Sequence, residues 1–160
     1  MTRSLDKLDQ RIINALAEDG RRSYRDIARD LNVSEASIRQ RVSKLTEDDL
    51  IRITAIGNLQ ALGFDVVAMV HFKVLPGRVE EYAQVISEYA AVRFVSISLG
   101  NADIIFQSLH ANIASLHDFV RNELSRRMPD IVSTEIFPLV KTLKSSWTWE
   151  AWFNLQNQSS

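Results

Sequence analysis

The chain has 160 residues and a net charge of −1 at pH 7, with 46% hydrophobic and 24% charged residues. These values are typical of a globular protein of one or two small domains and exclude a disordered chain. No apolar run reaches the roughly 18 residues that cross a membrane, and MTRSLDKLDQ at the start lacks the apolar stretch of a secretory signal. Cysteine is absent, which excludes disulfides and thiolate metal sites and favours a cytoplasmic protein.

Basic residues are concentrated in one stretch of the sequence. Residues 21–44 contain seven arginines and lysines against three acidic residues, whereas residues 56–160 contain eight against ten. A local positive field on a nearly neutral protein is expected where one face meets the phosphates of a nucleic acid. A solvated helix face would show the same excess, so the charge alone leaves both interpretations open.

The first fifty residues predict three short helices. Gly20 ends the first helix, and Ser23 and Ser34 are suited to cap the second and third, because a serine hydroxyl accepts from the first free amides. Between the last two helices only Asn32 and one further residue remain, which is the tight turn of a helix-turn-helix at about residues 24–43. The apolar positions at helical spacing are Leu8, Ile12, Ala15, Leu16, Ile27, Ala28, Leu31, Ile38, Val42 and Leu45.

The apolar period then changes from that of helices to that of strands. Residues 50–56, LIRITAI, alternate enough to predict a strand that would form a small wing. Further along, we predict strands over 64–74, 92–99, 103–110 and 131–144, with helices over 78–89 and 112–127. This βαββαβ order predicts an α+β, ferredoxin-like domain, in which one antiparallel sheet carries both helices on one face.

These elements divide the chain into two domains and a tail. The predicted boundaries are 1–60 for the helix-turn-helix domain, 61–150 for the ferredoxin-like domain and 151–160 for a C-terminal tail. One sheet face would remain uncovered, and we expect it to carry Val67, Met69, Ile97 and Ile105. Such an apolar patch usually marks an interface, so we predict a homodimer at least. Three tryptophans, Trp147, Trp149 and Trp152, fit packing or an interface better than ligand stacking.

The N-terminal helices resemble the DNA-binding domain of the Lrp/AsnC family, the leucine-responsive or feast/famine transcription regulators of bacteria and archaea. The residues that carry this resemblance are Leu5-Asp6, Asp9, Ile12–Leu16, Asp19-Gly20-Arg21, Ile27-Ala28, Ser34, Arg41-Val42 and Lys44-Leu45. Those similar to the family's ligand-sensing domain are Leu62-Gly63-Phe64, Pro76-Gly77, Gly100-Asn101-Ala102-Asp103 and Thr134-Glu135. The resemblance implies a regulator that binds double-stranded DNA, senses a small molecule such as an amino acid, and assembles from homodimers into tetramers or octamers.

Three positions depart from the pattern of that family. The family usually has glycine at the position of Asp49, an aromatic residue at Ala102, and a second hydroxyl at Ile136. The last two positions fall where the family holds its effector. The departures therefore concern the identity of the effector and whether one binds.

The third predicted helix carries the side chains suited to reading DNA. In the major groove, the N-terminal part of such a helix reads base edges, and cations around it contact phosphates. The candidates for base readout are Glu35, Ser37, Arg39 and Gln40. Further candidate DNA contacts are Arg21, Arg22, Tyr24, Arg25, Ser34, Arg41 and Lys44. For Arg41, a structural bridge to an acidic neighbour such as Asp9 is an equal alternative.

The turn at residues 100–103 has two interpretations. Gly100 can supply a positive φ while Asp103 satisfies turn amides, which already explains a hairpin. By the resemblance, the turn instead binds an amino acid, with Asp103 facing its ammonium group and turn amides facing its carboxylate. The effector contacts that the resemblance implies are Gly100, Asn101, Ala102, Asp103, Thr134 and Glu135.

Features of an enzyme are missing from the sequence. The three histidines, His71, His110 and His117, lack metal-ligand spacing, and we find no glycine-rich phosphate loop or nucleophile elbow. We therefore expect no catalytic activity, metal or cofactor. Two alternatives stay open: siroheme decarboxylases resemble the same two-domain fold but do not need a reading helix, and an architectural DNA-wrapping protein would need no effector.

Overall fold

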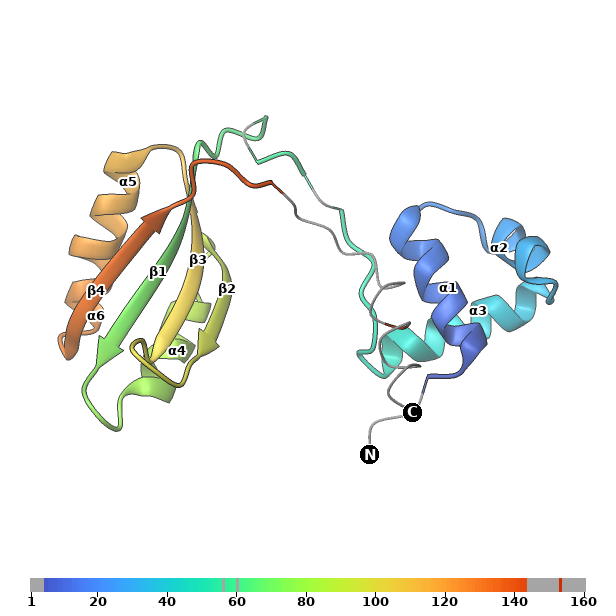
Figure 1. Cartoon of the computed structure of the whole chain (residues 1–160), viewed down its shortest axis with the longest axis horizontal. Helices are drawn as coiled ribbons and strands as arrows, with labels where there is room; N and C mark the ends of the chain where they lie inside the picture. Colours follow the sequence, from blue (N-terminus) through green and yellow to red (C-terminus); the bar gives the residue numbers. More distant parts are fainter. Residues whose placement is uncertain (1–4, 56, 60, 144–152, 154–160) are drawn as a thin grey trace. The chain divides into compact units, whose positions relative to one another are not determined.

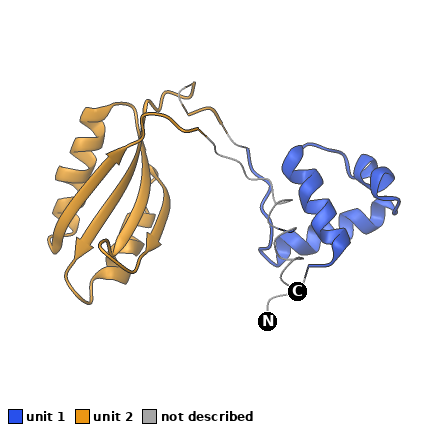
Figure 2. Cartoon of the chain, viewed as in Figure 1, with its two compact units in different colours: residues 1–56, 144–160 blue, residues 57–143 orange. Residues whose placement is uncertain are grey.

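A computed structural model describes residues 5–55, 57–59, 61–143 and 153. The chain divides into two compact units (Figure 2). We call the first, residues 5–55 together with Phe153, the headpiece, and the second, the described residues between 57 and 143, the sheet domain. Within these described parts, no helix is both long and apolar enough to span a bilayer.

Three helices form the headpiece, and each begins at a polar cap (Figure 1). They are α1 (Lys7–Glu18), α2 (Tyr24–Leu31) and α3 (Glu35–Glu47). The Asp6 carboxylate accepts a 2.8 Å hydrogen bond from the amide of Asp9, whose own carboxylate accepts from the amide of Asp6, which is a capping box. Ser23 and Ser34 cap α2 and α3 by accepting from the amide three residues later. The predicted helix-turn-helix is confirmed.

The turn between α2 and α3 is as tight as the sequence predicts. Asn32 adopts a left-handed conformation with a φ of 55°, which asparagine tolerates well. The amide of Val33 donates to the carbonyl of Ala28 at 3.0 Å. The core that this turn closes consists of Ile12, Ala15, Leu16, Ile27, Ala28, Ile38 and Val42. Because all three helices contribute to it, burial of one apolar face per helix holds the headpiece together.

Just after the C-terminal end of α3, Asp49 adopts the left-handed backbone conformation, with a φ of 53°. The amides of Leu50 and Ile51 both donate to the carbonyl of Leu45, at 2.9 and 3.2 Å. Glycine adopts this conformation most readily, which accounts for the glycine usual at this position in the resembled family. Residues 51–55 form no strand, so the predicted wing is wrong. Alternation produces a strand only beside a pairing partner, and the strands of the described chain all belong to the other unit.

The sheet domain has four antiparallel strands in the order β2-β3-β1-β4. Its elements are β1 (Val66–Val74), α4 (Val79–Ser87), β2 (Val92–Ile97), β3 (Ile104–His110), α5 (Ile113–Asp118), the π-helix η1 (Phe119–Leu124), α6 (Ser125–Arg127) and β4 (Ile131–Pro138). The helices pack on one face of the sheet around the buried side chains of Phe72, Ile86, Phe106 and Leu124 (Figure 1). The βαββαβ prediction is confirmed. The last strand is shorter than predicted: it ends at Pro138, although the amide of Leu139 still donates to the carbonyl of Val67 at 2.7 Å.

The sheet face that carries no helices, which we call the open face, has exposed apolar side chains among polar ones. Opposite residues of antiparallel strands share a face, and one row across the sheet runs Phe94, Gln107, Met69, Phe137. The two phenylalanines are 50% and 46% exposed. Ile97 is not on this face, contrary to the sequence-based expectation, because it pairs with Ile104, which is buried beneath the helices. A register shift in β2 between Val92 and Phe94 reverses the alternation that the sequence implies.

Candidate nucleic-acid interface

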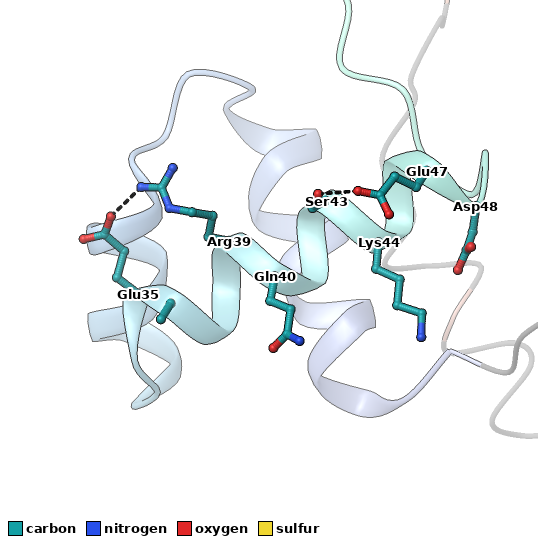
Figure 3. Close-up of a pocket in the computed structure, with 8 residues that line it drawn as sticks. Glu35, Arg39, Gln40, Ser43, Lys44, Glu47 and Asp48 are labelled. Atoms are coloured by element: carbon teal, nitrogen blue, oxygen red, sulfur yellow. Dashed lines mark hydrogen bonds and ion pairs between the residues drawn. The ribbon is translucent and has the colours of Figure 1, made fainter.

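One side of α3 is buried and the other carries polar and charged groups. Ile38, Val42 and Leu45 face the core. The side chains that line the outer surface of the helix are those of Glu35, Ala36, Arg39, Gln40, Ser43, Lys44, Glu47 and Asp48 (Figure 3). This arrangement leaves a row of hydrogen-bonding groups free of apolar cover along the whole helix. A helix with such a row can enter a DNA groove.

The predicted base-reading residues differ in how they are held. Arg39 donates to the Glu35 carboxylate at 2.9 Å (Figure 3), and its guanidinium lies 5.4 Å from the centre of the Tyr24 ring. Both contacts restrict the arginine before any DNA arrives. Gln40 and Lys44 are exposed, and among the described residues neither has a hydrogen-bonding or ionic side-chain partner. Ser34 is used as the cap of α3, where its hydroxyl accepts from the amide of Ser37.

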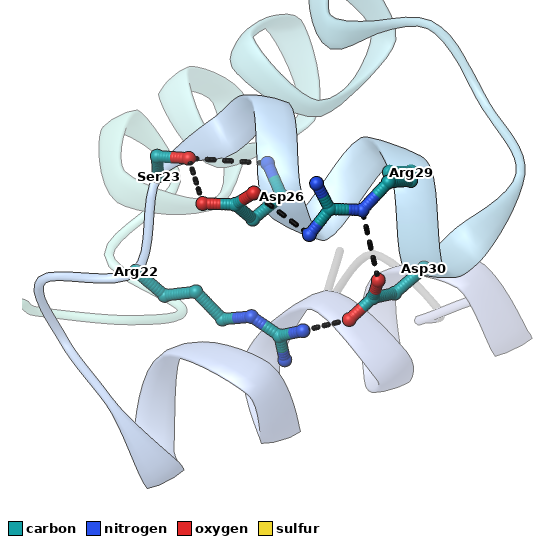
Figure 4. A network of polar contacts seen from close by, with 5 residues as sticks. All are labelled: Arg22, Ser23, Asp26, Arg29 and Asp30. Carbon is teal, nitrogen blue, oxygen red and sulfur yellow. Dashed lines mark hydrogen bonds and ion pairs between the residues drawn. The ribbon is translucent and has the colours of Figure 1, made fainter.

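Acidic side chains neutralise part of the positive charge at the start of α2. Arg22 pairs with Asp30, and Arg29 pairs with Asp26 at 2.9 Å (Figure 4). The pKa of Asp26 lies below its ordinary value, first because the Ser23 hydroxyl donates to its carboxylate and then because Arg29 is near. Asp26 therefore stays charged near neutral pH and holds Arg29, while Asp30 holds Arg22.

Three of the predicted DNA contacts remain as free cations. They are Arg21, Arg25 and Lys44, which are exposed and form no ion pair with any residue that the structure describes. An exposed cation without a carboxylate partner is the kind of group that neutralises a phosphate and releases its counterion. These three cations lie at the start of α2 and on the outer side of α3.

Arg41 joins α3 to the start of α1. Its guanidinium donates to Asp6 at 2.6 Å and to Asp9 at 2.8 Å, and the side chain of Asp9 is 1% exposed. The two carboxylates raise the pKa of Arg41 above its ordinary value. The pKa of Asp6 is lowered by the amide of Asp9 and then by Arg41. Of the two roles left open by the sequence, the geometry is that of the structural bridge, and Asp6 is a partner that sequence reasoning missed.

The predicted effector residues form two separate groups. Asp103 accepts from Lys73 at 2.7 Å and from the amide of Val74 at 3.0 Å, and Lys73 also donates to the carbonyl of Gly100. These contacts hold the turn, where Gly100 has a φ of 141° and Asn101 and Ala102 follow. The pKa of Asp103 is lowered by Lys73 first and by the Val74 amide second. Lys73 was missed because a lysine within a strand carries no signal of its own.

The other two predicted effector residues lie on the far side of β1, on strand β4. Thr134 pairs with Phe72, which is buried beneath the helices, whereas Glu135 pairs with His71 on the open face. Neighbouring residues of a strand point to opposite faces, so a single ligand lying on one face cannot contact both side chains. The structure brings Gly100 and Asp103 together and separates Thr134 from Glu135.

Comparisons with known proteins agree on a class of two-domain transcription regulators. Residues 5–46 match the AsnC-type helix-turn-helix domain, and residues 67–148 match the Lrp/AsnC ligand-binding domain. An uncharacterized HTH-type transcriptional regulator of Pyrococcus furiosus is 37% identical, with 88% of this chain and 95% of that protein aligned. The chain belongs to the Lrp/AsnC family, as the sequence-based resemblance predicted.

Solved structures share the fold at low sequence identity. AsnC of E. coli superimposes with a TM-score of 0.80 at 21% identity, over 89% of this chain and 97% of that one. A transcriptional regulator of Neisseria meningitidis in complex with L-Met gives 0.82 at 16% identity, over 93% and 99%. The protein is therefore a transcription regulator with a DNA-binding headpiece and a ligand-binding sheet domain.

We expect Arg41→Ala to lower the free energy of unfolding by roughly 2–4 kcal/mol, because the buried Asp9 carboxylate loses its cation. Urea denaturation followed by circular dichroism measures this change. Arg25→Ala is the matched control, because Arg25 is exposed and should alter stability by less than about 0.5 kcal/mol. A loss for Arg41→Ala as small as that of the control would contradict the bridging role.

Proposed function

We propose that this protein binds specific DNA sequences in the cytoplasm and regulates transcription, and that its DNA binding or assembly responds to a small molecule. An amino acid is the favoured class of effector. The observation that carries the proposal is the outer side of α3, where Arg39, Gln40 and Lys44 are exposed above a helix fixed by its apolar face. A helix held in this way presents its donors in a defined geometry to base edges.

The candidate DNA contacts divide into two tasks. Glu35, Ser37, Arg39 and Gln40 lie in the N-terminal half of α3 and are proposed to read bases. Arg21, Arg25 and Lys44, which have no carboxylate partner in the described chain, are proposed to bind phosphates, together with Arg22 and Tyr24 beside them. Phosphate contacts position the protein and make its affinity fall with salt, whereas base contacts set the sequence preference.

Substituting one residue of each kind separates the two tasks. Arg25→Ala should weaken binding to all duplexes about equally and reduce the slope of log affinity against log salt by about one. Arg39→Ala should cost about 1–3 kcal/mol on the preferred duplex and relax the preference at one base step. Fluorescence anisotropy on a selected duplex and on scrambled versions of it measures both effects.

Arg121→Ala provides the control for lost charge, because Arg121 is an exposed cation of the sheet domain. It should leave both the affinity and the salt slope unchanged. If Arg39→Ala behaved like this control, base readout by Arg39 would be excluded. If the unaltered protein bound every duplex equally, the result would point to an architectural DNA-binding protein instead.

The effector is proposed to bind at the turn of residues 100–103. Backbone amides of the turn suit a carboxylate, and Asp103 with Lys73 provides one group of each charge. The likeness to a regulator solved with L-Met supports an amino acid as the ligand class. Since Asp103 already pairs with Lys73, an incoming ammonium group has to compete with the lysine for the same carboxylate.

Isothermal titration calorimetry against the common amino acids tests this site. We expect binding heat for at least one of them and its loss in Asp103→Asn, because the amide removes the charge that holds an ammonium group. Ala61→Ser, at an exposed position away from the turn, is the control and should bind as before. No heat from any amino acid would contradict the proposed effector class.

The open face is proposed to pair two copies of the chain. Phe94, Met69 and Phe137 lie there in one row with Gln107, and a monomer would leave their apolar side chains in contact with water. Two such faces packed together would bury them, as sheets do in sandwiches. Dimers built in this way are proposed to assemble further into tetramers or octamers.

A charge at the centre of that row should separate the copies. Sedimentation velocity is expected to show a dimer or larger assembly for the unaltered protein and a smaller species for Met69→Glu, because the burial of a carboxylate is costly. Gln84→Glu adds the same charge on the exposed side of α4 and should leave the assembly intact. An unaltered assembly in Met69→Glu would exclude the open face as the interface.

A further inference from the structure

One residue of the headpiece core comes from the far end of the chain. Phe153 is 8% exposed and forms a buried cluster with Ile13 of α1 and Leu45 of α3. Leu50 and Ile51, which follow α3, pack against the same cluster. Phe153 lies beyond residues 5–46 and 67–148, the two ranges that match the family's domains. The headpiece therefore contains a core residue that neither family domain includes.

The cluster lies where α3 is anchored at its C-terminal end. Leu45 is fully buried, and its carbonyl accepts from the amides of Leu50 and Ile51. The main core of the headpiece, around Ile27 and Ile38, does not include Leu45. The buried side chains of this cluster besides Leu45 are Ile13 and Phe153, with Leu5, Leu50 and Ile51 packed at its edge, and the aromatic ring is the largest of them. Its loss would leave the last turn of α3 with an unfilled space on its buried side.

We propose that Phe153 is a positioning residue for DNA binding, which sets the orientation of α3 through Leu45. This inference rests on the proposed function of α3. The outer surface of the helix carries Lys44 within one turn of Leu45 and Gln40 within two, so a tilt of the C-terminal end moves both groups relative to the DNA. Base readout is sensitive to such a shift, because a bidentate hydrogen bond fails when its donors move out of plane.

The position of Phe153 in the chain adds a consequence for regulation. The chain leaves the headpiece before residue 57, forms the sheet domain, and supplies Phe153 after strand β4 has ended. Two chain segments thus join the headpiece to the sheet domain: one precedes the sheet domain and the other follows it. The chain that follows β4 leads to Phe153, which packs on the buried side of α3.

The discrimination between duplexes tests this role. In Phe153→Ala, measured well below the midpoint of thermal unfolding, we expect the ratio of affinities for a selected and a scrambled duplex to fall at least about fivefold. A purely stabilising side chain would change the folded fraction, which lowers both affinities equally and leaves the ratio unchanged. Amide hydrogen exchange of residues 45–51 should be faster in the same variant, with the sheet domain unaffected.

Two further variants complete the experiment. Phe153→Leu keeps an apolar side chain in the cluster, so it should restore most of the discrimination and remains informative if Phe153→Ala does not fold. Leu143→Ala removes an exposed apolar side chain, 85% accessible, and should bind DNA as the unaltered protein does. A ratio unchanged in both Phe153 variants, with DNA binding intact, would overturn the proposal while the proposed function stands. If the unaltered protein did not prefer any duplex, the result would contradict both the role of Phe153 and the proposed function.

Discussion

The guanidinium of Arg41 connects the middle of α3 to the first turn of α1, and the proposed DNA-binding surface depends on this bridge. Asp6 and Asp9 cap α1 reciprocally, and the same two carboxylates accept from Arg41. Because Asp9 is buried, its charge has to be compensated by fixed partners, and Arg41 reaches it at 2.8 Å from a correctly placed α3. The bridge thus defines the rotation of α3, which determines which of its side chains face outward.

Ion pairs also hold charged side chains in place elsewhere in the chain. Arg22 and Arg29 are held by Asp26 and Asp30, so the free cations of the headpiece are fewer than its basic composition suggests. In the sheet domain Lys73 holds Asp103. Such pairs select which charges remain available to a ligand. A polyanion meets the unpaired cations first, whereas a small zwitterion at residues 100–103 has to compete with an existing ion pair.

Local patterns made most of the fold predictable, and long-range contacts account for the rest. Serine caps, the Asn32 turn and helical spacing predict α1 to α3 because each signal lies within a few residues. The prediction that Ile97 lies on the open face was wrong because alternation in the sequence does not reveal the bulge in β2. The predicted wing was wrong because a strand requires a pairing partner. Residues 21–44 could be identified as the candidate site from their charge, but Lys73 and Phe153 could not. Their partners lie 27 or more residues away along the chain.

The most direct test is to place a photoreactive amino acid at Gln40, in the centre of the outer surface of α3, and to irradiate the protein on a duplex selected from a random pool. The account predicts a crosslink to one base position in the major groove. The same group at Gln84 on α4 should give none. A crosslink from position 84 and none from position 40 would mean that another surface meets DNA, and it would contradict the assignment of α3 as the reading helix.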